Sequence, residues 1–276
     1  MPFKRDWAEM TWEDFAGANP SWVAVLPLAA VEQHGPHLPL GTDAFIVEAY
    51  LARARKLLPE ALKVTFLPTQ KVGTSHEHRA YTGTLSLAPE ALIRALTDIA
   101  ESVHRAGLRK LVFANGHGGN VAALDLVALD VRARLNMLAV PCSFSRFGYP
   151  DGVFAPEEIA HGIHGGDVET SIMLAARPDL VRKDLAKNFV PASAAMAREF
   201  KRLRAGEPVG FGWMSQDLNP SGAIGDATLA AAAKGEATLA HGARAFVELL
   251  EDVAGFDLAR LADGPLPTAR TDPRTT

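Results

Sequence analysis

The chain of 276 residues (29.5 kDa) is 48% hydrophobic, which is enough to bury a full core as one domain spanning residues 1–276. Its 28 Lys and Arg residues against 32 Asp and Glu residues give a formal net charge of −4 and form no basic stripe, so we expect no nucleic acid partner. The stretch MPFKRDWAEM is charged, and no apolar run reaches the roughly 18 residues of a membrane span. These features, with the single cysteine Cys142, predict a cytoplasmic protein without disulfides or a membrane partner.

Strand and helix patterns alternate along the chain. Apolar segments rich in β-branched residues predict buried strands at residues 22–28, 63–68, 110–115 and 138–144. Helical patterns lie at residues 42–58, 89–107, after Asn120, near 166–176 and at about 235–253. Thr42 suits the N-cap of the first helix, and Gly107 suits the left-handed position that ends the second. This order predicts a three-layer α/β/α fold with a mostly parallel central sheet, whose ligand site lies at the carboxyl ends of the strands.

The second half of the chain is less regular. We expect a loop at about 145–164, a Gly-rich stretch at about 205–225 and a flexible tail from about residue 264. Trp213 and Met214 lie in the Gly-rich stretch, where they could line a pocket, contact another subunit or join the core.

The first cluster of polar residues directly follows the first predicted strand. Glu32 and His34 alternate in an extended segment, so both can face one site, and Asp43 can return to it from the following helix. Imidazoles suit zinc, iron or manganese, and carboxylates can bridge two cations about 3.5–4 Å apart. Alternatively, Glu32 and His34 are solvated loop residues and Asp43 only caps the helix.

The second cluster, Asn-Gly-His-Gly-Gly-Asn, follows the third predicted strand. Glycines on both sides of His117 allow close approach of the backbone, and the N–H groups of Gly118 and Gly119 could face an oxyanion. A plain connection or a phosphate cradle are the alternatives, but the segment lacks the P-loop lysine and the dinucleotide-binding spacing.

Two further segments bring histidines and acids together. His164 precedes a helix that carries Asp167 and Glu169 in its first turn, and Asp167 could serve only to favour the helix N-terminus. In the segment Gly-Thr-Ser-His-Glu-His, we expect His78 to line the pocket and leave the role of His76 open.

These segments resemble the signature segments of the creatininase family. The resemblance is carried by Glu-x-His-Gly-Pro-His-Leu-Pro-Leu-x-x-Asp from Glu32 to Asp43, by Asn-Gly-His-Gly-Gly-Asn and by His-Gly-Gly-x-x-Glu-Thr-Ser from His164. The pairs Glu77-His78, Gly83-Thr84 and Gly225-Asp226 echo further family positions, so the resemblance covers roughly residues 20–240. It implies a creatininase-like fold and two divalent metal ions per chain, with zinc as the first expectation and manganese or iron as alternatives.

The resemblance also implies the ligands: Glu32 and His117 for one ion, His34 for the other, and Asp43 as the bridge between them. Creatininase itself has a further glutamate ligand at the position of Gly119.

We expect Glu169 to supply this missing carboxylate, with Asp167 as the less favoured substitute. His164 aligns with the family's catalytic histidine, and its near-neutral pKa suits protonation of a leaving nitrogen. Its alternative role is to orient a ligand. By the resemblance, the tryptophan that covers creatinine in creatininase would fall near Ala160, so creatinine itself is not the expected substrate.

Together these features predict a binuclear metal-dependent amidohydrolase that cleaves a C–N bond of a small cyclic or formyl amide, with a metal-activated hydroxide as the nucleophile. His78, Gly118 and Gly119 are the expected substrate-binding residues, since the glycine N–H groups could hold the oxyanion. The alternatives are a peptidase of redox-cofactor maturation or a carbon–carbon ring-opening hydrolase of the same family, and a non-catalytic metal-binding protein. Family members form hexamers, so we expect a homo-oligomer.

Overall fold

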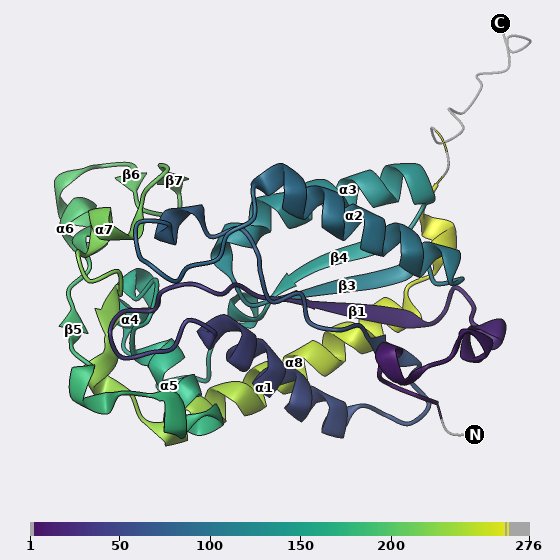
Figure 1. Ribbon diagram of the computed structural model, residues 1–276, viewed down its shortest axis with the longest axis horizontal. Coiled ribbons are helices and arrows are strands. Elements are labelled where there is room, and N and C mark those ends of the chain that lie inside the picture. Colours follow the sequence, from purple (N-terminus) through teal and green to yellow (C-terminus); the bar gives the residue numbers. More distant parts are fainter. Residues whose placement is uncertain (1–2, 263, 265–276) are drawn as a thin grey trace, which may run out of the picture.

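The computed structural model describes residues 3–262 and 264 of the chain, and its centre is a four-stranded sheet (Figure 1). The strands are β1 (Val23–Leu28), β2 (Val64–Phe66), β3 (Lys110–Asn115) and β4 (Leu138–Ser143). All neighbours pair in parallel, in the order β2-β1-β3-β4. The four predicted strands and their parallel arrangement are therefore confirmed.

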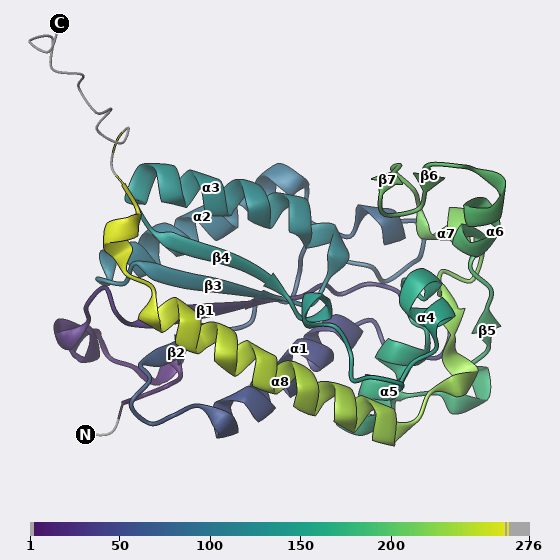
Figure 2. The same ribbon diagram turned by 180° about the vertical axis from the view of Figure 1, so that it is seen from behind.

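Helices cover both faces of the sheet. Figures 1 and 2 show α2 (Pro89–Arg105) and α3 (Val121–Leu135) on one face, and α1 (Thr42–Leu57) and α8 (Ala232–Gly255) on the other. The helix α5 (Asp167–Ala176) packs against α8 and α1. The predicted three-layer α/β/α architecture is confirmed.

The central strand β1 shows how the sequence builds this sandwich. Val23 and Val25 point into the hydrophobic cluster beneath α1 and α8, whereas Ala24, Leu26 and Leu28 point into the cluster beneath α2 and α3. Successive side chains of a strand alternate between its faces, so a continuous apolar run is what a sheet buried on both sides requires.

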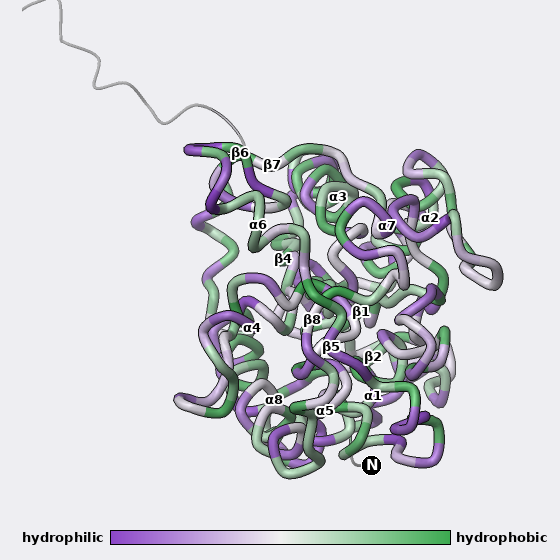
Figure 3. The backbone as a smooth tube through the Cα atoms, turned by 90° about the vertical axis from the view of Figure 1, so that its left-hand side faces the viewer, coloured by the Kyte–Doolittle hydropathy of each residue, from purple (hydrophilic) through white to green (hydrophobic). Residues whose placement is uncertain are grey.

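The remaining elements form a lobe beyond the carboxyl ends of the strands, seen end-on in Figure 3. They are α4 (Pro156–His161), β5 (Asn188–Phe189), α6 (Ala192–Glu199), β6 (Leu203–Arg204), β7 (Val209–Gly210), α7 (Ser215–Leu218) and β8 (Gly225–Asp226). Strands β5 and β8 pair antiparallel, and β6 and β7 pair in parallel.

No helix in the described part of the chain is long and apolar enough to cross a membrane.

Several local expectations can be compared with the structure. Gly107 ends α2 with a positive φ of 93°, as predicted. The N-cap of α1 is Gly41 and not Thr42, because the Thr42 hydroxyl donates backwards to the carbonyl of Pro39 at 2.6 Å. The stretch expected to be a loop at 145–164 contains the short helix α4. The tail expected to be flexible from about residue 264 lies, apart from residue 264 itself, outside the described residues.

Close packing of α5 on α8 depends on a glycine. A Cβ atom built on Gly235 would collide with the carbonyl of Ser171 and lie 2.8 Å from Cα of Ile172, so the backbones touch directly. We predict that Gly235→Ala lowers the free energy of unfolding by about 1–3 kcal/mol, because a methyl group must separate the two helices.

Thermal unfolding followed by circular dichroism measures this loss. Gly255→Ala, in the same helix but with nothing within 4 Å of the added Cβ, is the matched control and should be neutral or slightly stabilising. Equal melting temperatures for the two variants would contradict the packing argument.

Candidate metal centre

The site lies where the connections of the sheet diverge. The chain passes from β1 to β2 on one side and then crosses to β3 on the other side of β1, so the loops after β1 and β3 leave in different directions. Such a switch point opens a crevice at the carboxyl ends of parallel strands. Glu32 and His34 follow β1, and His117 follows β3, so topology alone brings them to one place.

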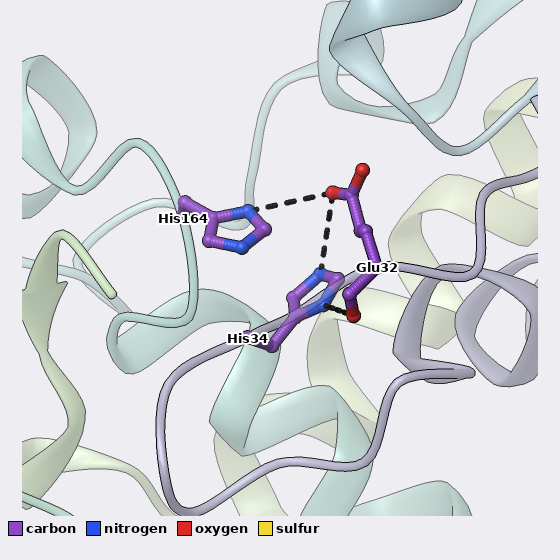
Figure 4. Close-up of side chains that lie close together, drawn as sticks. All are labelled: Glu32, His34 and His164. Atoms are coloured by element: carbon purple, nitrogen blue, oxygen red, sulfur yellow. Dashed lines mark hydrogen bonds and ion pairs between the residues drawn. The ribbon is translucent and has the colours of Figure 1, made fainter. Parts of the chain in front are cut away.

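Glu32 is the centre of the cluster and is fully buried. Its Oε1 lies 3.2 Å from Nδ1 of His117, 3.4 Å from Nε2 of His78, 3.7 Å from Nδ1 of His164 and 4.0 Å from Nε2 of His34. Figure 4 shows His34 and His164 converging on this one oxygen. Four imidazole nitrogens therefore surround a single carboxylate oxygen.

Asp43 lies in the first turn of α1, and each of its two carboxylate oxygens faces a different histidine. Its Oδ1 lies 3.1 Å from Nε2 of His34, and its Oδ2 lies 3.4 Å from Nδ1 of His117. Oδ2 of Asp43 and Oε1 of Glu32 are buried and have no hydrogen-bond partner in the described structure. Leaving such an atom unsatisfied costs about 1–3 kcal/mol, and more when it is charged, so these oxygens fit direct contact with cations.

The imidazole rings of His34 and His117 are oriented by main-chain carbonyls. Nδ1 of His34 donates to the carbonyl of Glu32 at 3.1 Å, and Nε2 of His117 donates to the carbonyl of Thr74 at 2.9 Å. The proton of each neutral ring is thereby placed away from the carboxylates, and the lone pairs of His34 Nε2 and His117 Nδ1 face the cluster. This is the usual arrangement of metal-binding histidines.

Of the two candidate acids on α5, the structure brings Glu169 into the cluster and leaves Asp167 outside it. Oε2 of Glu169 lies 3.8 Å from Nε2 of His34, and its side chain is 26% exposed. Asp167 instead forms a buried ion pair with Lys234 at 2.5 Å and accepts a hydrogen bond from Ser171 at 2.9 Å. One carboxylate oxygen of Asp167 thus links α5 to α8, and the other is bonded within α5.

Among residues 3–262 and 264, potential ligand atoms within 4.8 Å of one another form three groups: Glu32, Asp43 and His117; His34, Asp43 and Glu169; and Glu32, His34 and His164. The first two share Asp43, as the predicted two-ion arrangement requires. The third group was not predicted from the sequence. It places His164, which we expected to transfer a proton or to orient a ligand, within reach of a cation.

The charges of the cluster compensate one another. Burial raises the pKa of Glu32, but the charge of His117, whose Nδ1 lies 3.2 Å from Oε1, outweighs this and lowers that pKa to about 2. Burial lowers the pKa of His34 and His117, but Asp43 raises the former to about 9 and Glu32 raises the latter to about 10. Without metal, protonated imidazoles therefore neutralise the carboxylates.

A cavity of about 810 Å³ opens onto the cluster. The predicted substrate-binding residues His78, Gly118 and Gly119 all line it, and so does His76. Its apolar wall, which we call the outer wall, consists of Ile163, Phe211, Trp213 and Met214. Trp213 and Met214 both line the pocket, and Trp213 also packs against the small core cluster of Ala205, Leu218 and Ile224.

The structure also explains the glycine at position 119. A Cβ atom there would overlap the Thr74 carbonyl and lie 2.6 Å from Oε1 of Glu77. No side chain fits at Gly119 in this arrangement, so a carboxylate for the second ligand group has to come from another element.

Some residues of the site were not expected. Ser75 donates from its hydroxyl to Oε2 of Glu32 at 2.5 Å, and Oε1 of Glu77 lies 3.5 Å from Nε2 of His117. Both stand in the His-rich segment after β2, but nothing local in the sequence indicates these contacts. Conversely, His37 and His161 bond to Thr170 and Ser193 and do not line the cavity.

This fold and this cluster define the chain as an α/β protein with a candidate metal centre at a switch point of its sheet. Residues 8–250 match the family model described as Creatininase: Creatinine amidohydrolase. The chain belongs to the creatininase family and is a hydrolase that acts on carbon–nitrogen bonds.

Individual relatives agree with this assignment. A mycofactocin precursor peptide peptidase of Mycobacterium ulcerans strain Agy99 is 32% identical over 251 residues, which cover 89% of this chain and 88% of that protein. A creatinine amidohydrolase of Pseudomonas putida is 32% identical over 206 residues, covering 67% and 76% of the two chains. A solved manganese creatininase superposes with a TM-score of 0.73 at 26% identity, covering 92% of this chain and all of that one.

The raised pKa values of His34 and His117 predict that metal loading releases protons. A cation needs the neutral imidazoles, whereas both rings are protonated well above pH 7 in the metal-free chain. Zinc titration by calorimetry at about pH 8, in buffers of different ionisation enthalpy, should therefore show net proton release and an apparent affinity that rises with pH.

His104→Gln, on α2 and remote from the cluster, is the control and should leave the release unchanged, whereas His117→Asn should reduce it. A binding heat independent of the buffer would contradict the protonation state assigned here.

Proposed function

We propose that this chain is a binuclear metal-dependent amidohydrolase. The observation that carries the proposal is the placement of Asp43, whose two buried carboxylate oxygens each face a different histidine. Glu32 and His117 complete one group of ligand atoms and His34 and Glu169 the other. A solvated loop or a helix cap would not leave Oδ2 of Asp43 and Oε1 of Glu32 buried without hydrogen bonds.

Two divalent cations held by these residues would lower the pKa of a water molecule and polarise the carbonyl of the substrate. We favour zinc, with manganese or iron as alternatives, because the mixed nitrogen and oxygen donors suit all three. Solved relatives include a manganese creatininase and a variant of Zn–Zn type.

The residues around the cluster supply the remaining chemistry. His164 is buried, lines the cavity and turns Nδ1 toward Oε1 of Glu32, so we assign it the proton transfer to the leaving nitrogen. The near-neutral pKa expected from the sequence is wrong for the metal-free chain, because burial and the charge of His34 lower the pKa of His164 to about 3. The main-chain N–H groups of Gly118 and Gly119 are our candidates for holding the oxyanion, and His78 for contacting the substrate.

The proposed substrate is a small cyclic or formyl amide. A second candidate is a peptide bond, which the size of the 810 Å³ cavity and the similarity to mycofactocin precursor peptide peptidases favour. A small ring fills only a fraction of such a volume, which lies in the range of about 300–1,000 Å³ found for drug-sized ligands. A homo-oligomer, hexameric by family resemblance, and a cytoplasmic location remain expectations.

Metal content separates the two acids of α5. We predict about two metal ions per chain in the wild type and about one in Glu169→Ala, with loss of turnover on a panel of cyclic amides, formyl amides and peptides. Asp167→Asn is the matched control. It should lower the melting temperature by weakening the Lys234 pair, while two ions remain bound.

Two ions retained in Glu169→Ala would remove Glu169 from the ligands. No metal in either protein would remove the basis of the proposed function.

His164→Ala separates catalysis from ligation. If His164 transfers a proton, kcat should fall about 10²–10⁴-fold with both ions retained. Metal analysis and steady-state kinetics on the same preparation decide this. Loss of one ion would instead make His164 a ligand, and unchanged turnover would show that neither role is needed.

A further inference from the structure

Gln33 stands between Glu32 and His34 in the chain, is buried, and contributes to none of the ligand groups. Its side-chain amide nevertheless makes three hydrogen bonds inside the site. Oε1 accepts from N–H of Gly35 at 2.9 Å, and Nε2 lies 3.1 Å from the carbonyl of Gly222 and 2.7 Å from Nδ1 of His78.

The backbone fixes which way this amide points. The N–H group of Gly35 can only donate, so it must face Oε1, and the carbonyl of Gly222 can only accept, so it must face Nε2. Of the two protons on Nε2, one goes to Gly222 and the other is left for His78. The side chain of Gln33 also packs tightly against the backbone of Gly222. A Cβ atom added to Gly222 would lie only 2.5 Å from Cδ of Gln33.

This amide determines the tautomer of His78. Since Gln33 donates to Nδ1, that nitrogen carries the lone pair, and the neutral ring must carry its proton on Nε2. Nε2 lies 3.4 Å from Oε1 of Glu32. His78 therefore presents an N–H donor to the cluster and has no lone pair there to offer a cation.

The main chain of the same residue determines the tautomer of His164. The carbonyl of Gln33 accepts from Nε2 of His164 at 2.5 Å, so the lone pair is on Nδ1, which lies 3.7 Å from Oε1 of Glu32. The rings of His78 and His164 are stacked, with centroids 4.1 Å apart and planes 24° from parallel. One residue thus makes the cluster-facing nitrogens of two neighbouring imidazoles different: His78 presents an N–H group and His164 presents a lone pair.

We propose that Gln33 is a positioning residue that holds His78 as a hydrogen-bond donor, aimed at the reacting oxygen of the substrate, and keeps it from becoming a third histidine ligand. Its kinetic consequence rests on the proposed amidohydrolase function, whereas its effect on the tautomer of His78 does not. The two can therefore fail separately.

The direct test is ¹⁵N NMR of histidine-labelled protein, metal-free and zinc-loaded, with the His78 signals assigned by their loss in His78→Asn. We expect a protonated Nε2 and an unprotonated Nδ1 in the wild type in both states. In Gln33→Glu the carboxylate can only accept, so Nδ1 of His78 should become protonated. In Gln33→Met no partner remains, and the preference should be lost.

The kinetic test uses the same variants, loaded with zinc. We expect kcat to fall about 10–100-fold with metal content retained and KM changed less, since a misplaced donor acts mainly in the transition state. Gln70→Glu, a partly buried amide-to-acid change outside the cavity, is the control and should retain wild-type kcat and spectra.

A proton on Nδ1 of His78 in the wild type, or zinc bound at its Nε2, would overturn the inference. So would Gln33 variants with an unchanged His78 spectrum. If the variants fail to fold, the wild-type spectrum alone decides. If the wild type has the expected tautomer but hydrolyses no amide, the proposed function is wrong and the assignment of Gln33 is still supported.

Discussion

The structure depends on the burial of two acids beside one another. Glu32 is 0% exposed and Asp43 is 2% exposed, and an isolated buried carboxylate costs several kcal/mol, a large share of a domain's stability of about 5–15 kcal/mol. The cluster offsets this cost with two of its imidazoles, those of His34 and His117, whose raised pKa values keep them protonated in the metal-free chain. The buried charges of the metal-free site are thus compensated.

Main-chain carbonyls set the direction of this chemistry. Those of Glu32, Thr74 and Gln33 each accept a hydrogen bond from one ring nitrogen of a histidine, and so decide which nitrogen presents its lone pair to the cluster. Backbone groups cannot change their donor or acceptor character with pH or substitution. The tautomers of His34, His117 and His164 are therefore determined by the path of the loops. Side-chain replacements elsewhere affect these three tautomers only by moving those loops.

Much of this could be predicted from the sequence, for a physical reason. Apolar β-branched runs predicted the strands, and parallel strands bring the residues that follow them to one edge, so Glu32, His34 and His117 had to meet. The short helix α4 escaped prediction because it has too few turns for periodicity. The roles of Gln33 and Ser75 escaped it too, because they depend on hydrogen bonds between loops distant in sequence.

The outer wall has a consequence for how this protein could diversify. The candidate ligands come from the loops after β1 and β3 and from α1 and α5, whereas three of the four wall residues come from 211–214. Only Ile163 adjoins a residue of the catalytic cluster. Substitutions in the 211–214 segment can therefore reshape the cavity wall without replacing a candidate ligand. Trp213 is less free to vary, because it packs against Ile224, whose backbone pairs with His164. Phe211 and Met214 are thus the positions at which the same set of ligands could serve new substrates.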